Sequence, residues 1–138
     1  MHYPHVLASA LAIFGAISTT AAAATPILQG EIQTLQIDIL NYINDLVQSK
    51  PSQNDFNAGS AVFVTLIKDI NGGNAYQCPP GLPGLPADTN AAIGYLQNTQ
   101  LSLMTVSQDL LQSNAKQALS DACGASNLYA ATSGFATS

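Results

Sequence analysis

Apolar residues recur every three or four positions between residues 28 and 46, and no other feature constrains the fold of this chain as strongly. Such a period is typical of an amphipathic helix with one buried face. Ile37, Leu40 and Val47 widen the stripe, so we expect contacts with neighbouring helices on more than one side. The helix should end at Lys50-Pro51, because a residue before proline disfavours the helical conformation. The main stripe consists of Leu28, Ile32, Leu35, Ile39, Ile43 and Leu46.

Two further helical stretches follow. The first should run from about Asp55 to Ile70, because Ser52 and Asp55 have the spacing of a helix start and Asn71-Gly72-Gly73 supplies a stop. Its apolar face contains Phe56, Ala61 or Val62, Phe63, Leu66, Ile67 and Ile70. The second stretch should be capped by Asp88 or Thr89 and run toward Cys123. Its main stripe is Ala92, Leu96, Leu103, Val106 and Leu110.

The last stretch is longer than a typical globular helix, so we expect a break near Asn98-Thr99 or near Ser113-Asn114. Gly124 should end or kink it, and residues 125–138 would form a short last helix or a frayed end. No alternating strand pattern competes with these helices. The predicted fold class is all-α, as a small antiparallel bundle of three to five helices with a long Pro/Gly-rich loop stapled by one disulfide.

The loop is the segment 71–87, whose prolines and glycines are incompatible with a helix or a central strand. Cys78 in this loop and Cys123 are predicted to form a disulfide, which would close a loop of about 45 residues and contribute roughly 3–4 kcal/mol. Either the segment is a lid or binding loop, with Tyr76, Leu82 and Leu85 as its apolar contacts, or it is a stapled connector.

Residues 1–23 have the layout of a secretory signal peptide. An apolar stretch from Val6 to Ile17 is followed by a run of alanines, with cleavage expected after Ala22, Ala23 or Ala24. The apolar stretch is shorter than the roughly 20 residues of a spanning helix. We therefore expect residues 24–138 to be a single helical domain without an integral membrane segment, secreted and either free or associated with a cell wall.

The residue types that are missing exclude several classes of function. Both histidines, His2 and His5, lie in the predicted signal peptide, and the chain has no Arg. The predicted mature chain therefore lacks the usual general base, the usual metal ligand and the usual phosphate ligand. An acidic chain of net charge -5 does not neutralise nucleic-acid phosphates. We expect no nucleic-acid partner, no cofactor, no metal site and no catalytic residue.

Carboxylates are the remaining candidates for chemistry. Glu31, Asp38 and Asp45 are spaced by seven, which we interpret as a solvated helix face. A hydrolase would require a cleft with at least two close carboxylates, for example among Asp88, Asp109 and Asp121.

A thin helical bundle can also open a slot for an acyl chain between its helices. Tyr76 or Tyr95 would then stand at the mouth of the slot. In the alternative interpretation, the same apolar side chains simply fill the core. The candidate lining residues are Phe63, Leu66, Ile67, Leu96, Leu103 and Val106.

The segment 38–70, DILNYINDLVQSKPSQNDFNAGSAVFVTLIKDI, joins two amphipathic helices through a Lys-Pro junction. In this respect the chain resembles the fungal hydrophobic surface-binding protein A family, which is related to cell-wall galactomannoproteins. The Pro-rich loop and the cysteine pair depart from that family. The resemblance implies a secreted or wall-associated protein that adsorbs to hydrophobic surfaces or carries fatty acids. The alternative is a secreted effector that acts on a protein or polysaccharide partner through residues 71–87.

Overall fold

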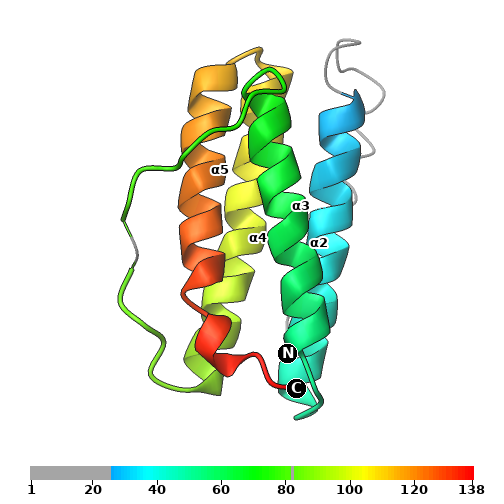
Figure 1. The fold of residues 1–138 in the computed structure, drawn as a ribbon, viewed down its shortest axis with the longest axis vertical. Coiled ribbons are helices and arrows are strands. Elements are labelled where there is room, and N and C mark those ends of the chain that lie inside the picture. The colour runs from blue at the N-terminus through cyan, green and yellow to red at the C-terminus, as the bar shows by residue number, and fades with distance from the viewer. Residues whose placement is uncertain (1–25, 82) are drawn as a thin grey trace.

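The computed structural model describes residues 26–81 and 83–138, which form four α-helices and one short 3-10 helix (Figure 1). The predicted signal peptide and Leu82 lie outside the described residues. No strand occurs in the described part of the chain, so the all-helical class is confirmed. The elements are α2 (Pro26–Val47), α3 (Gln53–Ile70), α4 (Thr89–Leu111), α5 (Ala115–Ala130) and η1 (Ser133–Phe135).

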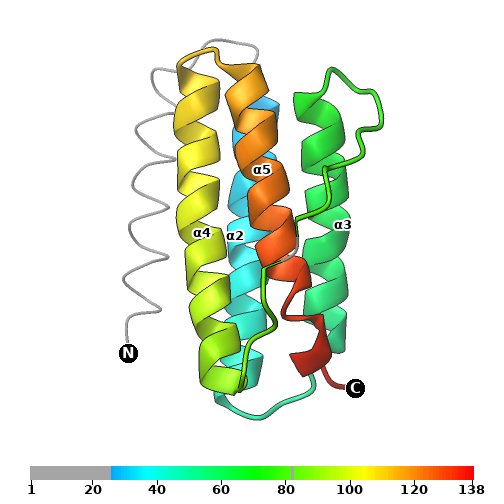
Figure 2. The ribbon, with the colours of Figure 1, turned by 90° about the vertical axis from the view of Figure 1, so that its left-hand side faces the viewer.

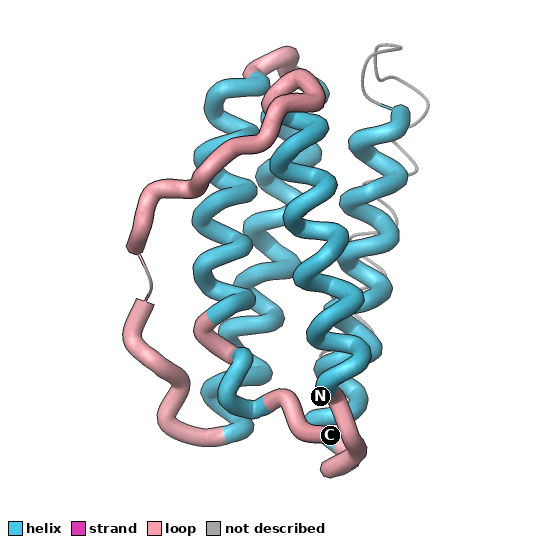
Figure 3. The backbone as a smooth tube through the Cα atoms, viewed as in Figure 1, coloured by secondary structure: helices cyan, strands magenta, loops and turns pink. Residues whose placement is uncertain are grey.

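The helices pack as a four-membered bundle in which α2 contacts α3 and α4, and α5 contacts the same two helices. In Figures 1 and 2, α2 and α5 run in one direction and α3 and α4 run in the other. Each helix is therefore antiparallel to both neighbours. Because α3 and α4 are parallel, the chain between them must return along the whole bundle, and Figure 3 shows residues 71–81 and 83–88 along this long connection.

The core is made by the residues of the predicted stripes. Ile32, Leu35, Ile39 and Ile43 of α2 are buried, as expected for a helix that contacts two neighbours. The side of α2 that faces α4 also carries buried amides. Gln29 Nε2 donates to Ser107 O at 3.4 Å, and Gln36 Nε2 donates to Gln100 O at 2.9 Å.

An aromatic cluster closes the end of the bundle where α2 and α5 finish. The rings of Phe56 and Tyr129 stack at 4.9 Å between centroids, and Tyr42 contacts both rings edge-on. Tyr129 Oη donates to Phe56 O at 2.8 Å, and Tyr42 Oη donates to Thr132 O at 2.9 Å. Burial raises the pKa of both phenols, so they remain protonated donors.

The C-terminal tail is part of this end of the fold. Gly124 does not end α5, which continues to Ala130, so the predicted stop at this residue was wrong. A frayed tail was also wrong, because Ser52 N and Gln53 N both donate to Thr137 O. Ser52 Oγ accepts from Thr137 N at 3.1 Å instead of capping its own helix, which is why the predicted S-x-x-D start lacks its side-chain hydrogen bond.

Three of the predicted boundaries are confirmed. Asp88 caps α4 by accepting from Ala91 N at 2.8 Å, and α3 ends before Asn71-Gly72-Gly73, where Gly72 has a φ of 73°. The predicted long helix breaks at residues 112–114, where Ser113 has a φ of 59°. The alternative break near Asn98-Thr99 does not occur, because Thr99 is buried and its hydroxyl donates to Tyr95 O within the helix.

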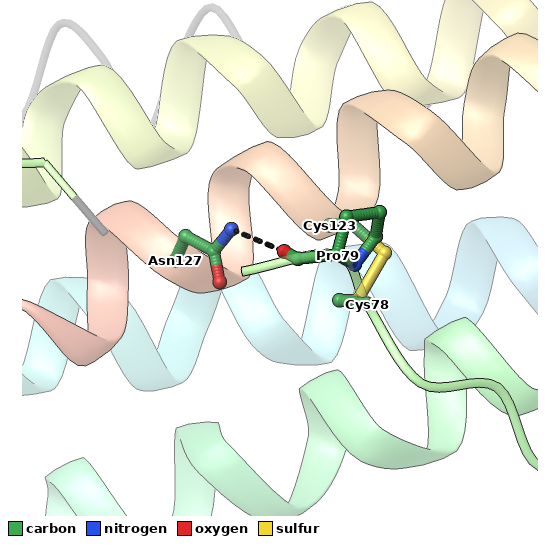
Figure 4. Close-up of a disulfide and its surroundings, with 4 residues drawn as sticks. All are labelled: Cys78, Pro79, Cys123 and Asn127. Carbon is green, nitrogen blue, oxygen red and sulfur yellow. Dashed lines mark hydrogen bonds between the residues drawn. A yellow bond between two sulfur atoms is a disulfide. The ribbon is translucent and has the colours of Figure 1, made fainter. Parts of the chain in front are cut away.

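The disulfide between Cys78 and Cys123 is confirmed and joins the long connection to α5 (Figure 4). Asn127 Nδ2 adds a hydrogen bond to Pro79 O at 3.5 Å, one turn further along α5. Tyr95 Oη donates to Gly84 O and ties the second half of the connection to α4. The segment is therefore held at several points without secondary structure of its own.

Candidate functional site

The six side chains predicted to line a slot fill the core of the bundle. The hydroxyl of Tyr95 donates a hydrogen bond to Gly84 O. Tyr76 is 41% exposed and lies in a groove beside the long connection. The slot prediction thus named buried residues, and the candidate binding surface lies outside the core. The six buried residues are Phe63, Leu66, Ile67, Leu96, Leu103 and Val106.

A groove with a volume of about 500 Å³ lies between α2 and α3 on the outside of the bundle. It is open to solvent. Small residues stand four apart on both helices, Gly30 and Thr34 on α2 and Ala61 and Thr65 on α3. Residues four apart share one helix face, so two rows of short side chains oppose each other and leave the groove between them. Its lining residues are Ile27, Gly30, Glu31, Thr34, Ala61, Val62 and Thr65.

The groove is mostly apolar, and exposed apolar side chains lie in it and near it on the surface. Ile27 is 76% exposed at the start of α2. Val64, three residues from Ala61 on the surface of α3, is 69% exposed. A carbon atom added to Gly30 would meet no other atom within 4 Å, which shows how open the floor of the groove is at that point.

One titratable side chain lines this groove. Glu31 is half-buried, and its Oε1 atom is buried without a hydrogen-bond partner. Burial raises the pKa of Glu31 to about 7, and a hydrogen bond with Asp69 of α3 and the negative charge of Asp69 act in the same direction. Near neutral pH, Glu31 at the edge of the groove is therefore present in both its neutral and its charged form.

The prediction that Glu31, Asp38 and Asp45 lie on a solvated helix face was wrong, because all three are half-buried. Asp45 lies two heptads after Glu31 and, like Glu31, interacts with an acid of α3, in this case Asp55. Burial raises the pKa of Asp45 to about 6, with contributions from a hydrogen bond with Asp55 and from its charge, against a lowering by Lys50. Burial, followed by the charge of Asp55, also raises the pKa of Asp38.

A third carboxyl pair joins α4 and α5. Burial raises the pKa of Asp109 to about 6, and a hydrogen bond with Asp121 and its charge add to the effect. The prediction that two of the three candidate aspartates could be close is thus met by Asp109 and Asp121, while Asp88 caps the far end of α4.

A second surface lies where the long connection crosses α5. It is a groove of about 380 Å³ beside the disulfide. Tyr76, Pro79 and Pro80 form one side of the groove. Lys116, Leu119 and Asn127 form the other side on α5.

Neither surface has features of a metal site or a membrane span. No three His, Cys, Asp or Glu side chains gather as a metal site would require anywhere in residues 26–81 and 83–138. Over the same residues, no helix is both long enough and apolar enough to cross a bilayer. Comparison of the chain with protein-family models, curated proteins and solved structures gives no match.

Proposed function

We propose that this chain is a secreted, non-catalytic helical protein that binds apolar ligands, with the acyl chain of a fatty acid lying in the groove between α2 and α3. The observation that carries the proposal is the groove itself, an open channel of about 500 Å³ with a largely apolar lining. Its volume falls within the range of about 300–1,000 Å³ that is usual for small-molecule sites. The same exposed residues would allow adsorption to a hydrophobic surface or a wall component.

The energetics support a weak to moderate affinity. Each fully buried methylene contributes about 0.8 kcal/mol, and an open groove covers only one side of an acyl chain. Part of this gain is lost to the entropy of association. We therefore expect affinities in the micromolar range rather than the nanomolar range.

Three other observations agree with this assignment. A structural disulfide is typical of proteins that fold in an oxidising compartment, which fits secretion. The predicted mature chain has no histidine and the chain has no arginine, which favours binding over catalysis. The resemblance of residues 38–70 to hydrophobic surface-binding proteins points to the same class of ligand, and that segment contains the α3 side of the groove, Ala61, Val62 and Thr65.

The test is native mass spectrometry of the protein collected from the medium of a secreting host, before and after incubation with a mixture of fatty acids. We expect a discrete adduct of acyl-chain mass that is lost on denaturation. Gly30→Phe should abolish the adduct, because Gly30 lines the groove and a bulky side chain there would occupy the space of the acyl chain. A wild-type protein that stays bare at all lipid concentrations would refute the proposal.

Two control variants separate filling of the groove from general damage. Gly30→Ala should retain the adduct, since a methyl group leaves most of the groove open. Gly94→Phe on α4 should also retain it, because Gly94 has equally free space around it but lines none of the grooves described above. Loss of the adduct in Gly94→Phe would show that a bulky substitution disrupts binding from any position.

A second candidate function is favoured by the groove beside the long connection. Its exposed Tyr76 and its prolines would suit a polysaccharide or an extended protein segment. The test is co-sedimentation with insoluble wall polysaccharide. Tyr76→Ala should release the protein into the supernatant, whereas Gly30→Phe should not. Equal sedimentation of both variants and wild type would refute this alternative.

A further inference from the structure

The α2–α3 groove contains a feature that a purely apolar channel does not need. Glu31, the residue after Gly30 on α2, is one of its lining residues. Its carboxyl group interacts with that of Asp69 on α3. Two acids that meet across a helix interface repel each other when both are ionised and share a hydrogen bond when one is protonated. The wall of the groove therefore has two electrostatic states.

We infer that filling of the α2–α3 groove by an acyl chain is coupled to protonation of Glu31, so that the protein takes up the chain in acid and releases it in alkali. This inference rests on the proposed function and names the regulation of the same site. The coupling follows from position, because an apolar ligand in the groove displaces water from beside Glu31. Removing water disfavours the carboxylate relative to the neutral acid.

The effect is reciprocal by thermodynamic linkage. If the ligand binds the protonated protein more tightly, then bound ligand must also raise the affinity of Glu31 for its proton. Burial and Asp69 already raise the pKa of Glu31 to about 7 in the free protein. The change in protonation of Glu31 therefore occurs in an accessible range of pH. A further rise of about one unit on binding corresponds to a tenfold difference in affinity between acid and alkaline solution.

Other charged groups do not offset the interaction between Glu31 and Asp69. On α2, Asp38 is the next acid, and it interacts with Asp55 of α3. On α3, Lys68 precedes Asp69 in sequence but is exposed, and it does not contribute to the raised pKa of Glu31. From α4, Asp109 lies toward the same end of the bundle, where its partner is Asp121 of α5. The switch is therefore Glu31, and Asp69 is the neighbouring acid that raises its pKa.

The probe must not titrate, so 1-dodecanol is used in place of a fatty acid. Its affinity for the secreted protein is measured at pH 5.5 and pH 8.5. We expect about tenfold tighter binding at pH 5.5. Glu31→Gln should bind at both values of pH with the affinity that the wild type shows at pH 5.5, because the amide imitates the neutral acid. Asp69→Asn should reduce the dependence on pH, since it removes the neighbouring charge.

Asp109→Asn is the matched control, because it alters a carboxyl pair of the same kind away from the groove. It should retain the tenfold difference. Binding by the wild type with less than a twofold difference between the two values of pH would overturn the inference and leave the proposed function standing. A full pH dependence in Glu31→Gln would overturn it as well. Absence of binding at both values of pH would overturn the proposed function and this inference together.

Discussion

Gly59 sets the distance between α3 and α5 at the aromatic end of the bundle. A carbon atom added at this residue would lie 2.8 Å from Cζ of Tyr129 and still closer to its hydroxyl oxygen. Tyr129 cannot retreat without losing its hydrogen bond to Phe56 O and its stacking on the Phe56 ring. A single missing side chain thus permits both interactions, although Gly in the middle of a helix costs about 1 kcal/mol relative to Ala.

We therefore predict that Gly59→Ala destabilises the protein by about 1–3 kcal/mol, despite the better helix propensity of Ala, because overpacking outweighs it. The free energy of unfolding is measured by chemical denaturation. Gly30→Ala is the matched control on α2, where the added methyl group meets nothing, and it should stabilise by about 0.5–1 kcal/mol. A stabilising Gly59→Ala would show that α3 and α5 are not held in this close contact.

At the scale of elements, the flank of α2 that faces α3 carries acids at heptad spacing. Glu31 meets Asp69 and Asp45 meets Asp55, while Asp109 and Asp121 meet across α4 and α5. Flanking positions of helical pairs often carry opposite charges that attract across the interface. With two acids at each of these interfaces, the folded bundle is instead more stable when one acid of each pair is protonated.

The sign of the pH dependence follows from the raised pKa values. The folded protein holds protons on Glu31, Asp45 and Asp109 more tightly than the unfolded chain does. Their contribution to stability is therefore complete below about pH 4 and is lost as the pH rises through about 6 to 7. The melting temperature should fall between pH 4.5 and pH 8, and a constant melting temperature would contradict this account.

A substitution isolates one pair. Asp45→Asn should leave stability nearly unchanged at pH 4 and raise the free energy of unfolding by about 1 kcal/mol at pH 8, where the native Asp45 is ionised beside Asp55. Denaturation curves at the two values of pH provide the measurement. A loss of stability at pH 8 would mean that the carboxylate of Asp45 is stabilising in its charged form.

At the scale of the whole molecule, the long connection allows α3 and α4 to be parallel in a bundle of antiparallel neighbours. The disulfide attaches it to α5 and closes a loop of 45 residues that contains α4. The double variant Cys78→Ser/Cys123→Ser should lose roughly 3–4 kcal/mol of stability by the chain-entropy argument. The wild type should lose the same amount under reducing conditions. A double variant as stable as the oxidised wild type would show that the connection is held by its other contacts.

The sequence predicted features that depend on neighbours within one helix. Helical periods, the Asp88 cap, the stop at Asn71-Gly72-Gly73 and the cysteine pair are all local or compositional signals. Features that depend on distant partners were missed. The hydroxyl of Ser52 is engaged by Thr137, and the seven-residue spacing of acids did not reveal that α3 carries matching acids.

The groove between α2 and α3 was not predicted, for a related reason. The large apolar residues that were predicted to line a slot form the core instead, because large apolar side chains are the ones most often buried in a bundle. The informative signal was the small residues four apart on two successive helices, Gly30 and Thr34 with Ala61 and Thr65. That signal becomes specific only when the two helices are known to face each other.

The most direct test of the central claim is a methyl-detected NMR titration of the secreted protein with 1-dodecanol at pH 5.5. If the ligand lies in the α2–α3 groove, saturable shifts should be confined to the methyl groups of Ile27, Thr34, Ala61, Val62 and Thr65, while those of Leu96, Leu103 and Val106 stay unchanged. Shifts centred on the core methyl groups, or no shifts at any concentration, would contradict the account.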